Sequence, residues 1–409
     1  MPLYLNPKKN SQSMSVLVVN GGSSSLRIQL LDADSERRLA RGMVERIGAV
    51  SSIASLQIGE NAAERHGVKA ADHTGALRIL LNRVTDAAPV DIDAIQVVGH
   101  RVVHGGEHFS DSVLIDDAVI ASIRDAFDLA PLHNPANLAG ILAAKEVLAA
   151  VPHVAVFDTA FHQTLPKSAF LYGIPYRLYR RHKIRRYGFH GTSHRYVSRR
   201  LYEVAQIAAT ASRVITCHLG NGCSMAAIRN GASVDTTMGL TPLSGLVMGT
   251  RSGDVDPSVI FYLMEKEEMG LAEIHALLNR QSGLLGLSEY ESDMRIVCEQ
   301  AALGDERCQD AIDVFCYRVR GTIGQYMAAL NGCDAIVFTG GIGEHAALIR
   351  AQVCAELDDL GVVLDFDRNE QEVEGERLIS TDGAGVAVWV IPTDEELLIA
   401  RDAIRVAGV

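Results

Sequence analysis

The sequence predicts an α/β fold in which one strand–turn–strand arrangement occurs twice. In the first copy, the apolar run 16–19 leads into Asn20-Gly21-Gly22 and three serines, and residues 26–30 then alternate between apolar and polar. That period of two indicates a half-buried strand. Residues 214–228 repeat the same plan. Asn20 and Asn221 lie about half of the 409-residue chain apart, so we expect an internal duplication.

Both turns have a composition that suits phosphate. Glycines let the backbone approach an anion, and exposed amides and hydroxyls supply donors. A strand rather than a helix follows each turn, which sets aside the P-loop and the dinucleotide-binding fingerprint. An ordinary Ser/Gly hairpin remains the alternative for one copy alone. The repetition, with further strands expected at 38–44 and 232–236, favours two phosphate-binding hairpins.

Composition and charge narrow the classes of function. A chain of 409 residues predicts two domains, and a net charge of −12 argues against nucleic acid and anionic membranes as partners. Seven cysteines without a C-x-x-C pair indicate reduced thiols in a cytoplasmic protein rather than disulfides or structural zinc. No apolar run reaches membrane-span length. Residues 1–13 are polar and predict a disordered extension or an upstream start rather than a secretory signal.

Two charged residues stand at the ends of predicted strands in the first half. Arg101 ends the expected strand 91–103, just before two glycines, and Asp158 ends the strand 154–158. Open α/β sheets place chemistry at such ends. A structural ion pair remains the alternative for Arg101, and a helix N-cap the alternative for Asp158. Residues 45–90 carry no motif, and a helix is expected at 138–150.

The second half contains basic loops and a glycine turn. Arginines and histidines surround glycine at 185–195, and Arg251 lies in a loop at 238–257 that is too long for a simple connection. Helices are expected at 257–285, broken near Ser282, and at 293–330. A buried strand at 335–339 runs into Gly340-Gly341-Ile342-Gly343 and a helix to about Leu357, an arrangement that suits a nucleotide.

The last predicted elements are a strand at 386–391 and a helix that opens with Thr393 as its N-cap. Glu395 lies in the first turn of this helix. The helix dipole alone accounts for an acid at this position, so the sequence pattern does not assign a chemical role to Glu395.

Together these motifs resemble the acetate kinases of the acetate/sugar kinase–Hsp70–actin superfamily, over nearly the whole chain from Val16 to about Ala407. The resemblance implies two duplicated actin-like, ribonuclease H-like ATPase domains that flank a nucleotide cleft. It places residues 14–158 and 393–409 in the N-terminal domain and residues 159–392 in the nucleotide-binding domain.

The basic residues fit the chemistry that this resemblance implies. A carboxylate acceptor has a pKa of about 4–5 and is already ionised, so unlike an alcohol it needs no general base. Its difficulty is repulsion from ATP, which Mg²⁺, arginine and histidine offset during in-line transfer. Arginine suits both partners because its fork matches carboxylate and phosphate oxygens. We therefore expect phosphoryl transfer to a carboxylate.

The resemblance also implies individual roles. His190 and Arg251 match transition-state stabilisers, and Asp158 matches a catalytic aspartate that we expect to position groups or bind magnesium. Mg²⁺, or Mn²⁺ in its place, is expected at Asn20 and Glu395. The implied substrate-binding residues are Arg101 for the carboxylate, His133, and an apolar pocket of Val103, Leu132, Phe189 and Pro242. The implied residues for ATP or ADP are Ser23, Ser25, Arg27, His218, Leu219, Gly220, Asn221, Gly222, Asp293, Met294, Arg295, Gly341, Ile342, Gly343, Glu344 and His345.

Two positions depart from the family pattern: Arg27 replaces the usual lysine and His345 the common asparagine. Val103, where some propionate kinases have a smaller residue, favours acetate over propionate. The predicted activity is thus reversible, Mg²⁺-dependent transfer between ATP and acetate in a cytoplasmic homodimer. A propionate kinase is the nearest alternative. An actin- or Hsp70-like ATPase module is disfavoured because the chain has no separate polypeptide-binding domain.

Overall fold

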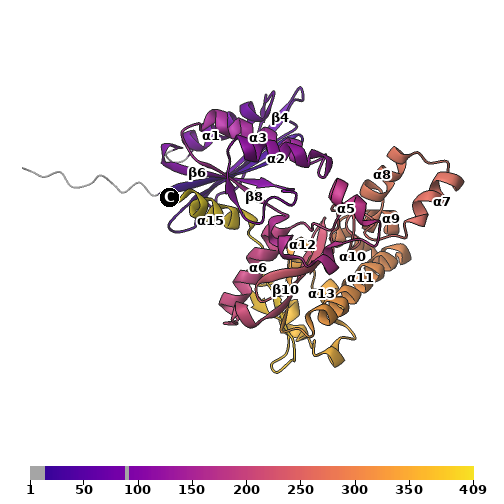
Figure 1. The fold of residues 1–409 in the computed structure, drawn as a ribbon. Helices are drawn as coiled ribbons and strands as arrows, with labels where there is room; N and C mark the ends of the chain where they lie inside the picture. The colour runs from indigo at the N-terminus through magenta and orange to yellow at the C-terminus, as the bar shows by residue number, and fades with distance from the viewer. Residues whose placement is uncertain (1–13, 88–91) are drawn as a thin grey trace, which may run out of the picture. The chain divides into compact units, whose positions relative to one another are not determined.

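The computed structural model describes residues 14–87 and 92–409. The described residues divide into two compact units: 14–87, 92–160 and 395–409 in one, and 161–394 in the other (Figure 1). We call these the first and second units and describe each by itself. The predicted extension at 1–13 and the predicted start of a strand at Asp91 lie outside the described residues.

The first unit contains an eight-stranded sheet in the order β5-β4-β3-β2-β1-β6-β8-β7. Neighbours from β5 to β1 pair antiparallel, whereas β6 runs parallel to β1 and β8 parallel to β6. The strands are β1 (Ser15–Gly22), β2 (Ser25–Asp32), β3 (Arg38–Glu45), β4 (Ser52–Ile58), β5 (Glu64–Val68), β6 (Ile95–Val102), β7 (Val113–Leu114) and β8 (His153–Phe157).

The second unit contains a six-stranded sheet in the order β11-β10-β9-β12-β14-β13. Its first three strands pair antiparallel, β12 runs parallel to β9, and β14 runs parallel to β12. This is the same succession of pairings as β3-β2-β1-β6-β8, which confirms the predicted duplication. The strands are β9 (Arg213–Leu219), β10 (Cys223–Arg229), β11 (Ala232–Thr236), β12 (Ala335–Thr339), β13 (Arg377–Leu378) and β14 (Ala387–Val390).

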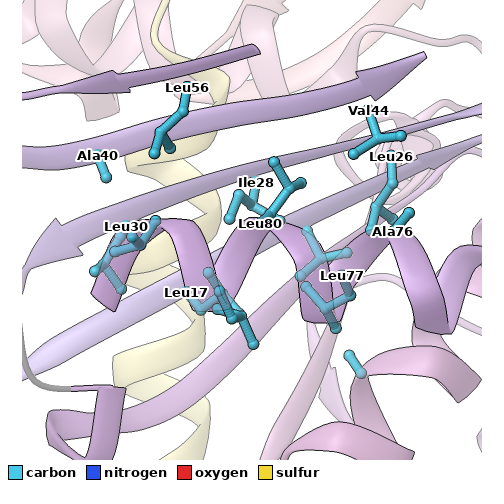
Figure 2. Packing of buried hydrophobic residues seen from close by; sticks show 14 of the residues in the cluster. Leu17, Leu26, Ile28, Leu30, Ala40, Val44, Leu56, Ala76, Leu77 and Leu80 are labelled. Carbon is cyan, nitrogen blue, oxygen red and sulfur yellow. The ribbon is translucent and has the colours of Figure 1, made fainter. Parts of the chain in front are cut away.

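Both faces of the first sheet are covered by helices. Leu17 and Leu26 pack on one face in a core cluster with Leu77 and Leu80 of α1 (His73–Ala87), as Figure 2 shows. Residues of opposite parity, such as Val18, pack on the other face against α15 (Glu395–Ala407). Alternation along each strand therefore supplies both cores. The unit also contains α2 (Asp117–Asp125) and α3 (Asn134–Val147).

Most helices of the second unit are short. The longest is α11 (Glu306–Leu330). The others are α4 (Lys167–Phe170), α5 (Tyr176–His182), α6 (Gly191–Val204), α7 (Ser258–Lys266), α8 (Leu271–Arg280), α9 (Gly283–Ser288), α10 (Met294–Ala302), α12 (Gly340–His345), α13 (Ala347–Cys354) and α14 (Phe366–Glu370). Within the described residues, no helix is both long and apolar enough to cross a membrane.

Several boundaries differ from the prediction. Residues 45–90, which carried no motif, contribute β4, β5 and α1. The helical stretch 293–330 breaks at Gly304, whose φ is +98°, before Asp305 caps α11. The helix expected to run on to Leu357 is divided at Ala346 into α12 and α13. Thr393 is not the N-cap, because α15 begins at Glu395 and Asp394 precedes it.

Candidate active site

The first phosphate hairpin is β1–β2, with Ser23 and Ser24 exposed at its tip. Helix α3 packs closely beneath it. A β-carbon on Gly21 would lie 2.6 Å from the carbonyl oxygen of Ala136, so only glycine fits there. The Asn137 amide donates to the Gly21 carbonyl at 2.8 Å, and its Oδ1 accepts from the Val103 amide at 3.0 Å. Asn137 therefore ties the hairpin to the end of β6.

Arg27 is exposed on β2 and stands opposite Asn20 in the hairpin register. Its one hydrogen bond in the described part of the chain runs from Nε to the Met43 sulfur, at 3.2 Å. A sulfur is a weak acceptor, so this contact leaves the guanidinium charge without an anionic partner. Arg27 thus keeps the positive charge that a lysine would supply at this position.

Arg101 and Asp158 form an ion pair. Arg101 donates from Nη2 to Oδ2 at 2.7 Å and from Nε to the same oxygen at 3.1 Å. The Asp158 side chain is 1% exposed and that of Arg101 is 25% exposed. This carboxylate, chiefly, raises the pKa of Arg101 above its usual value, and Glu395 contributes in the same direction. The ion pair that the sequence left as an alternative therefore exists.

The ion pair leaves donors for a substrate. Nη1 of Arg101 has no hydrogen-bond partner in the described part of the chain, and Nη2 carries a second hydrogen beyond the one given to Asp158. These two groups form the outer edge of the guanidinium fork, which matches a carboxylate. Both alternatives for Arg101 are thus compatible: Asp158 holds one edge of the guanidinium and orients the other.

The first-unit members of the predicted acyl pocket differ in burial. Val103 is 6% exposed, while Leu132 is 53% exposed. His133 occupies the position before α3, and its side chain makes no capping bond. The next residue, Asn134, is fully buried; its Nδ2 donates to the His104 carbonyl and its Oδ1 accepts from the His104 amide. Asn134 is therefore a structural residue.

The predicted metal ligands Asn20 and Glu395 both belong to the first unit. Asn20 lies in β1, and Glu395 opens α15. Within the described residues, no group of three or more histidine, cysteine or acidic side chains could hold a metal ion. Mg²⁺ commonly uses one or two protein oxygens and completes its shell with water and phosphate. An amide and a carboxylate oxygen fit that donor chemistry.

In the second unit, His190 and Arg251 converge on the second phosphate hairpin. A β-carbon on Gly222 would lie 3.4 Å from Cε1 and 3.5 Å from Nε2 of His190, and 3.6 Å from Nη1 of Arg251. These residues come from three separate stretches of sequence. The space above Gly222 thus has an imidazole edge and a guanidinium facing it, which is an arrangement for an anion.

His190 has an unusual backbone conformation. It precedes α6 with φ of +53°, in the left-handed region. That conformation costs a residue other than glycine or asparagine about 1–2 kcal/mol. Its ring stacks on His218 with centroids 4.3 Å apart. Nine other non-glycine residues of the described chain share this conformation, so it does not by itself identify His190 as catalytic.

Arg251 has a half-buried charge without an anionic partner in the described part of the chain. Its Nη1 donates to the Pro242 carbonyl at 3.3 Å, and burial lowers its pKa. The loop around it is fixed by backbone bonds from Gly249 to Asn221 and from Leu284 to Met248. A guanidinium that is rigidly held and uncompensated attracts an anionic ligand. Phe189, also predicted for the acyl pocket, is 2% exposed.

A cavity of about 870 Å³ lies beside this hairpin within the second unit. Its walls come from Gly220 and Asn221 of the hairpin, from the start of α10, and from α12 and the first residues of α13. The structure thus brings together three stretches that the sequence assigned to the nucleotide. The predicted residues lining the cavity are Gly220, Asn221, Asp293, Met294, Arg295, Gly341, Ile342 and His345.

Other predicted nucleotide residues have structural contacts. Asp293 caps α10 and pairs with Arg295. The Glu344 carboxylate accepts from the amides of Gly340, at 2.9 Å, and Thr393, at 3.2 Å. It therefore fixes the glycine turn rather than lining the cavity. His345 is exposed at the cavity rim.

Sequence reasoning missed the bridging role of Asn137. Its signal was a polar residue within the otherwise apolar stretch 135–144, but the groups that its amide contacts lie 34 and 116 positions away. Contacts at such separations leave no local pattern.

Comparison with known proteins identifies the family. A family model described as the acetokinase family matches residues 15–401. The chain belongs to the acetokinase family. It is 51% identical over 396 residues to an acetate kinase of Thermotoga maritima, a match that covers 95% of this chain and 98% of that one. The family recognised in the sequence is therefore confirmed.

Solved structures of the acetokinase family share the whole fold. The crystal structure of a Porphyromonas gingivalis acetate kinase matches with a TM-score of 0.93 and 43% identity, over 96% of this chain and 99% of that one. A propionate kinase from Francisella tularensis matches with a TM-score of 0.89 and 40% identity, over the same shares. These matches confirm the predicted duplicated α/β fold class.

Proposed function

We propose that this protein is an acetate kinase that transfers the γ-phosphoryl group of ATP reversibly to acetate, giving acetyl phosphate and ADP. The observation that carries the proposal is the 51% identity to an acetate kinase over nearly the full length of both chains. The geometry of both units agrees with it. Each supplies positive charge where an ionised acceptor or a transferred phosphoryl group needs it.

In the proposed reaction, Arg101 binds the acetate carboxylate through the guanidinium edge that Asp158 leaves open. Acetate is ionised at neutral pH, so the reaction requires no proton abstraction. Asp158 then serves as a positioning residue for Arg101. His190 and Arg251 stabilise the charge on the transferred phosphoryl group above Gly222. The ionised acceptor can itself attack the γ-phosphorus, so we propose direct in-line transfer without a covalent intermediate.

ATP binds, in this proposal, with its nucleoside in the cavity beside α12 and its phosphates at the two hairpins. The backbone amides at the start of α12 and the hydroxyls of Ser23 and Ser25 are the donors. Asn20 and Glu395 would hold Mg²⁺. The ion would neutralise phosphate charge, which is the chemistry that kinases require of it.

Propionate kinase is the second candidate, favoured by the Francisella tularensis match. The discriminating residue is Val103, which is 6% exposed at the end of β6. One methylene in an apolar pocket is worth about 1–3 kcal/mol, so propionate should be a poorer substrate rather than an excluded one.

We further propose that the protein acts as a homodimer in the cytoplasm. Helix α7 has no buried residue, although its sequence is largely apolar. Phe261 is 67% exposed and Tyr262 is 61% exposed. A second copy of the chain is the proposed cover for this face. The variant Phe261→Asp should then be monomeric in light scattering, and a dimeric variant would contradict this interface.

A hydroxamate assay with ATP and Mg²⁺ tests the proposed function. Acetate, propionate and butyrate are compared, with Arg101→Ala as the control variant. We expect acetate to be preferred and the variant to lose most of its kcat/KM. A preference for propionate would refute the role given to Val103 but would not contradict the proposed transfer to a carboxylate. ATP hydrolysis without any hydroxamate would refute the proposed function.

A further inference from the structure

Behind His190 lies a row of buried side chains that no role assigned above explains. The Ser224 Oγ lies 2.9 Å from Nδ1 of His190 and 2.8 Å from Nε2 of His194. The other ring nitrogen of His194, Nδ1, lies 2.7 Å from Oγ1 of Thr216. Ser224, His194 and Thr216 are completely buried. The row leads from the interior of the second unit to the ring edge of His190 opposite Nε2.

The exposed end of the row determines where its protons lie. Nε2 of His190 faces the space above Gly222 that Nη1 of Arg251 also faces. An anion in that space requires an N–H at Nε2, because a lone pair there would repel it. A neutral imidazole carries one N–H, so Nδ1 of His190 must then accept a hydrogen bond. The neighbour that can donate it is Ser224.

The remaining protons follow from this first one. A hydroxyl has one hydrogen, so Ser224 donates to His190 and must accept from Nε2–H of His194. His194 has a pKa well below its usual value, chiefly because it is buried, and is therefore neutral. With its single hydrogen on Nε2, its Nδ1 accepts from the hydroxyl of Thr216. One proton order thus satisfies every group in the row.

A second buried pair in the same unit has the same polarity. Nε2 of His162 lies 3.0 Å from the carbonyl oxygen of Phe189, which can only accept. Nδ1 of His162 must therefore accept from the hydroxyl of Ser233, at 2.8 Å. Ser233 donates to a histidine Nδ1 here, as Ser224 does in the row. The His162 ring lies edge-on to His194, with centroids 5.7 Å apart, but the hydroxyl of Ser233 bonds His162 rather than a member of the row, so Ser233 offers a matched control.

We propose that Ser224 and His194, ordered by Thr216, are positioning residues that hold His190 as the neutral tautomer with its proton on Nε2. The inference rests on the proposed role of His190 in stabilising the transferred phosphoryl group. Without the row, the ring can place its proton on either nitrogen, and only one of the two tautomers can donate to the phosphoryl oxygens.

Kinetics of Ser224→Ala provide the first test. Losing one orienting hydrogen bond corresponds to about a tenfold fall in kcat. The KM values for acetate and ATP should stay within about twofold, because Ser224 contacts neither. Ser224→Thr keeps the hydroxyl and should recover activity, and Thr216→Val should lower kcat by less. Ser233→Ala removes a comparable buried bond and should keep the wild-type kcat. Equal losses in Ser224→Ala and Ser233→Ala would overturn the proposal.

Imidazole nitrogen NMR provides the second test, on folded protein with ¹⁵N-labelled histidine. The His190 signals are identified by their loss in His190→Gln. We expect a protonated Nε2 and an unprotonated Nδ1 in the wild type, and a mixture of tautomers in Ser224→Ala. If Ser224→Ala does not fold, Thr216→Val replaces it. A wild-type His190 with its proton on Nδ1 would overturn the positioning proposal. An inactive wild type with the expected tautomer would instead refute the proposed function.

Discussion

Substituting Gly222 by alanine tests whether the reacting phosphoryl group lies where His190 and Arg251 converge. The new methyl group would lie 3.5 Å from Nε2 of His190 and 3.6 Å from Nη1 of Arg251, in contact with both donors. It would occupy the place that we assign to a phosphoryl oxygen. Removing one such donor commonly costs about 10²–10³ in kcat. We therefore expect kcat to fall at least about 100-fold.

The same geometry predicts that the variant folds normally. No atom lies closer than 3.4 Å to the added methyl group, so the folded state needs little adjustment. Gly→Ala at a compatible position raises stability by about 0.4–1 kcal/mol through the unfolded chain. Gly324→Ala in α11 is the matched control, because its methyl group would meet nothing within 4 Å. Steady-state kinetics and thermal unfolding measure both variants. A stable Gly222→Ala enzyme with kcat within threefold of wild type would refute this placement.

Three further predictions concern other parts of the protein. Arg101→Ala removes an ion-pair partner from the buried carboxylate of Asp158 and should lower the free energy of unfolding by about 3 kcal/mol, whereas Arg101→Ala with Asp158→Ala should recover most of that loss without recovering acetate binding. Equal urea midpoints for the two variants would contradict the pairing. Val103→Ala should raise the propionate-to-acetate ratio of kcat/KM by about tenfold, and an unchanged ratio would exclude Val103 from the pocket. Burial lowers the pKa of His162 from 6.5 to about 4, so the unfolded chain takes up a proton at this residue first as the pH falls. The free energy of unfolding should therefore drop between pH 6.5 and 4, by about 3 kcal/mol for this group. In urea titrations His162→Gln should flatten this pH dependence, and parallel slopes for variant and wild type would contradict the prediction.

The elements predicted correctly are those whose signal is local. The hairpins β1–β2 and β9–β10 were predicted because glycine turns and alternating residues lie within 15 positions of sequence. Strand β4 was missed because its inward positions include Ser52 and Ala54, which weaken the apolar alternation. Strand β5 has no buried residue at all. The break at Gly304 had a usable signal, a glycine followed by a capping aspartate.

The candidate site was predictable residue by residue, but its contacts were not. Arg101 and Asp158 were each expected to act on ligands, and their pairing across 57 positions appears only in the fold. The convergence of His190 and Arg251 on Gly222 likewise combines three distant stretches. Ser224 and His194 lie in two stretches that the sequence pattern singled out, the second hairpin at 214–228 and the basic loop at 185–195. Their common hydrogen bond depends on the packing of α6 against the second sheet, which no spacing rule provides.

Oxygen-labelled acetate tests the central claim, phosphoryl transfer from ATP to a carboxylate, most directly. The enzyme is incubated with ATP, Mg²⁺ and [¹⁸O₂]acetate, and the products are followed by ³¹P NMR. We expect one acetyl phosphate for each ATP consumed, with ¹⁸O bound to phosphorus, and no consumption of ATP without acetate. Release of inorganic phosphate at the same rate with and without acetate would contradict the claim and indicate an ATPase.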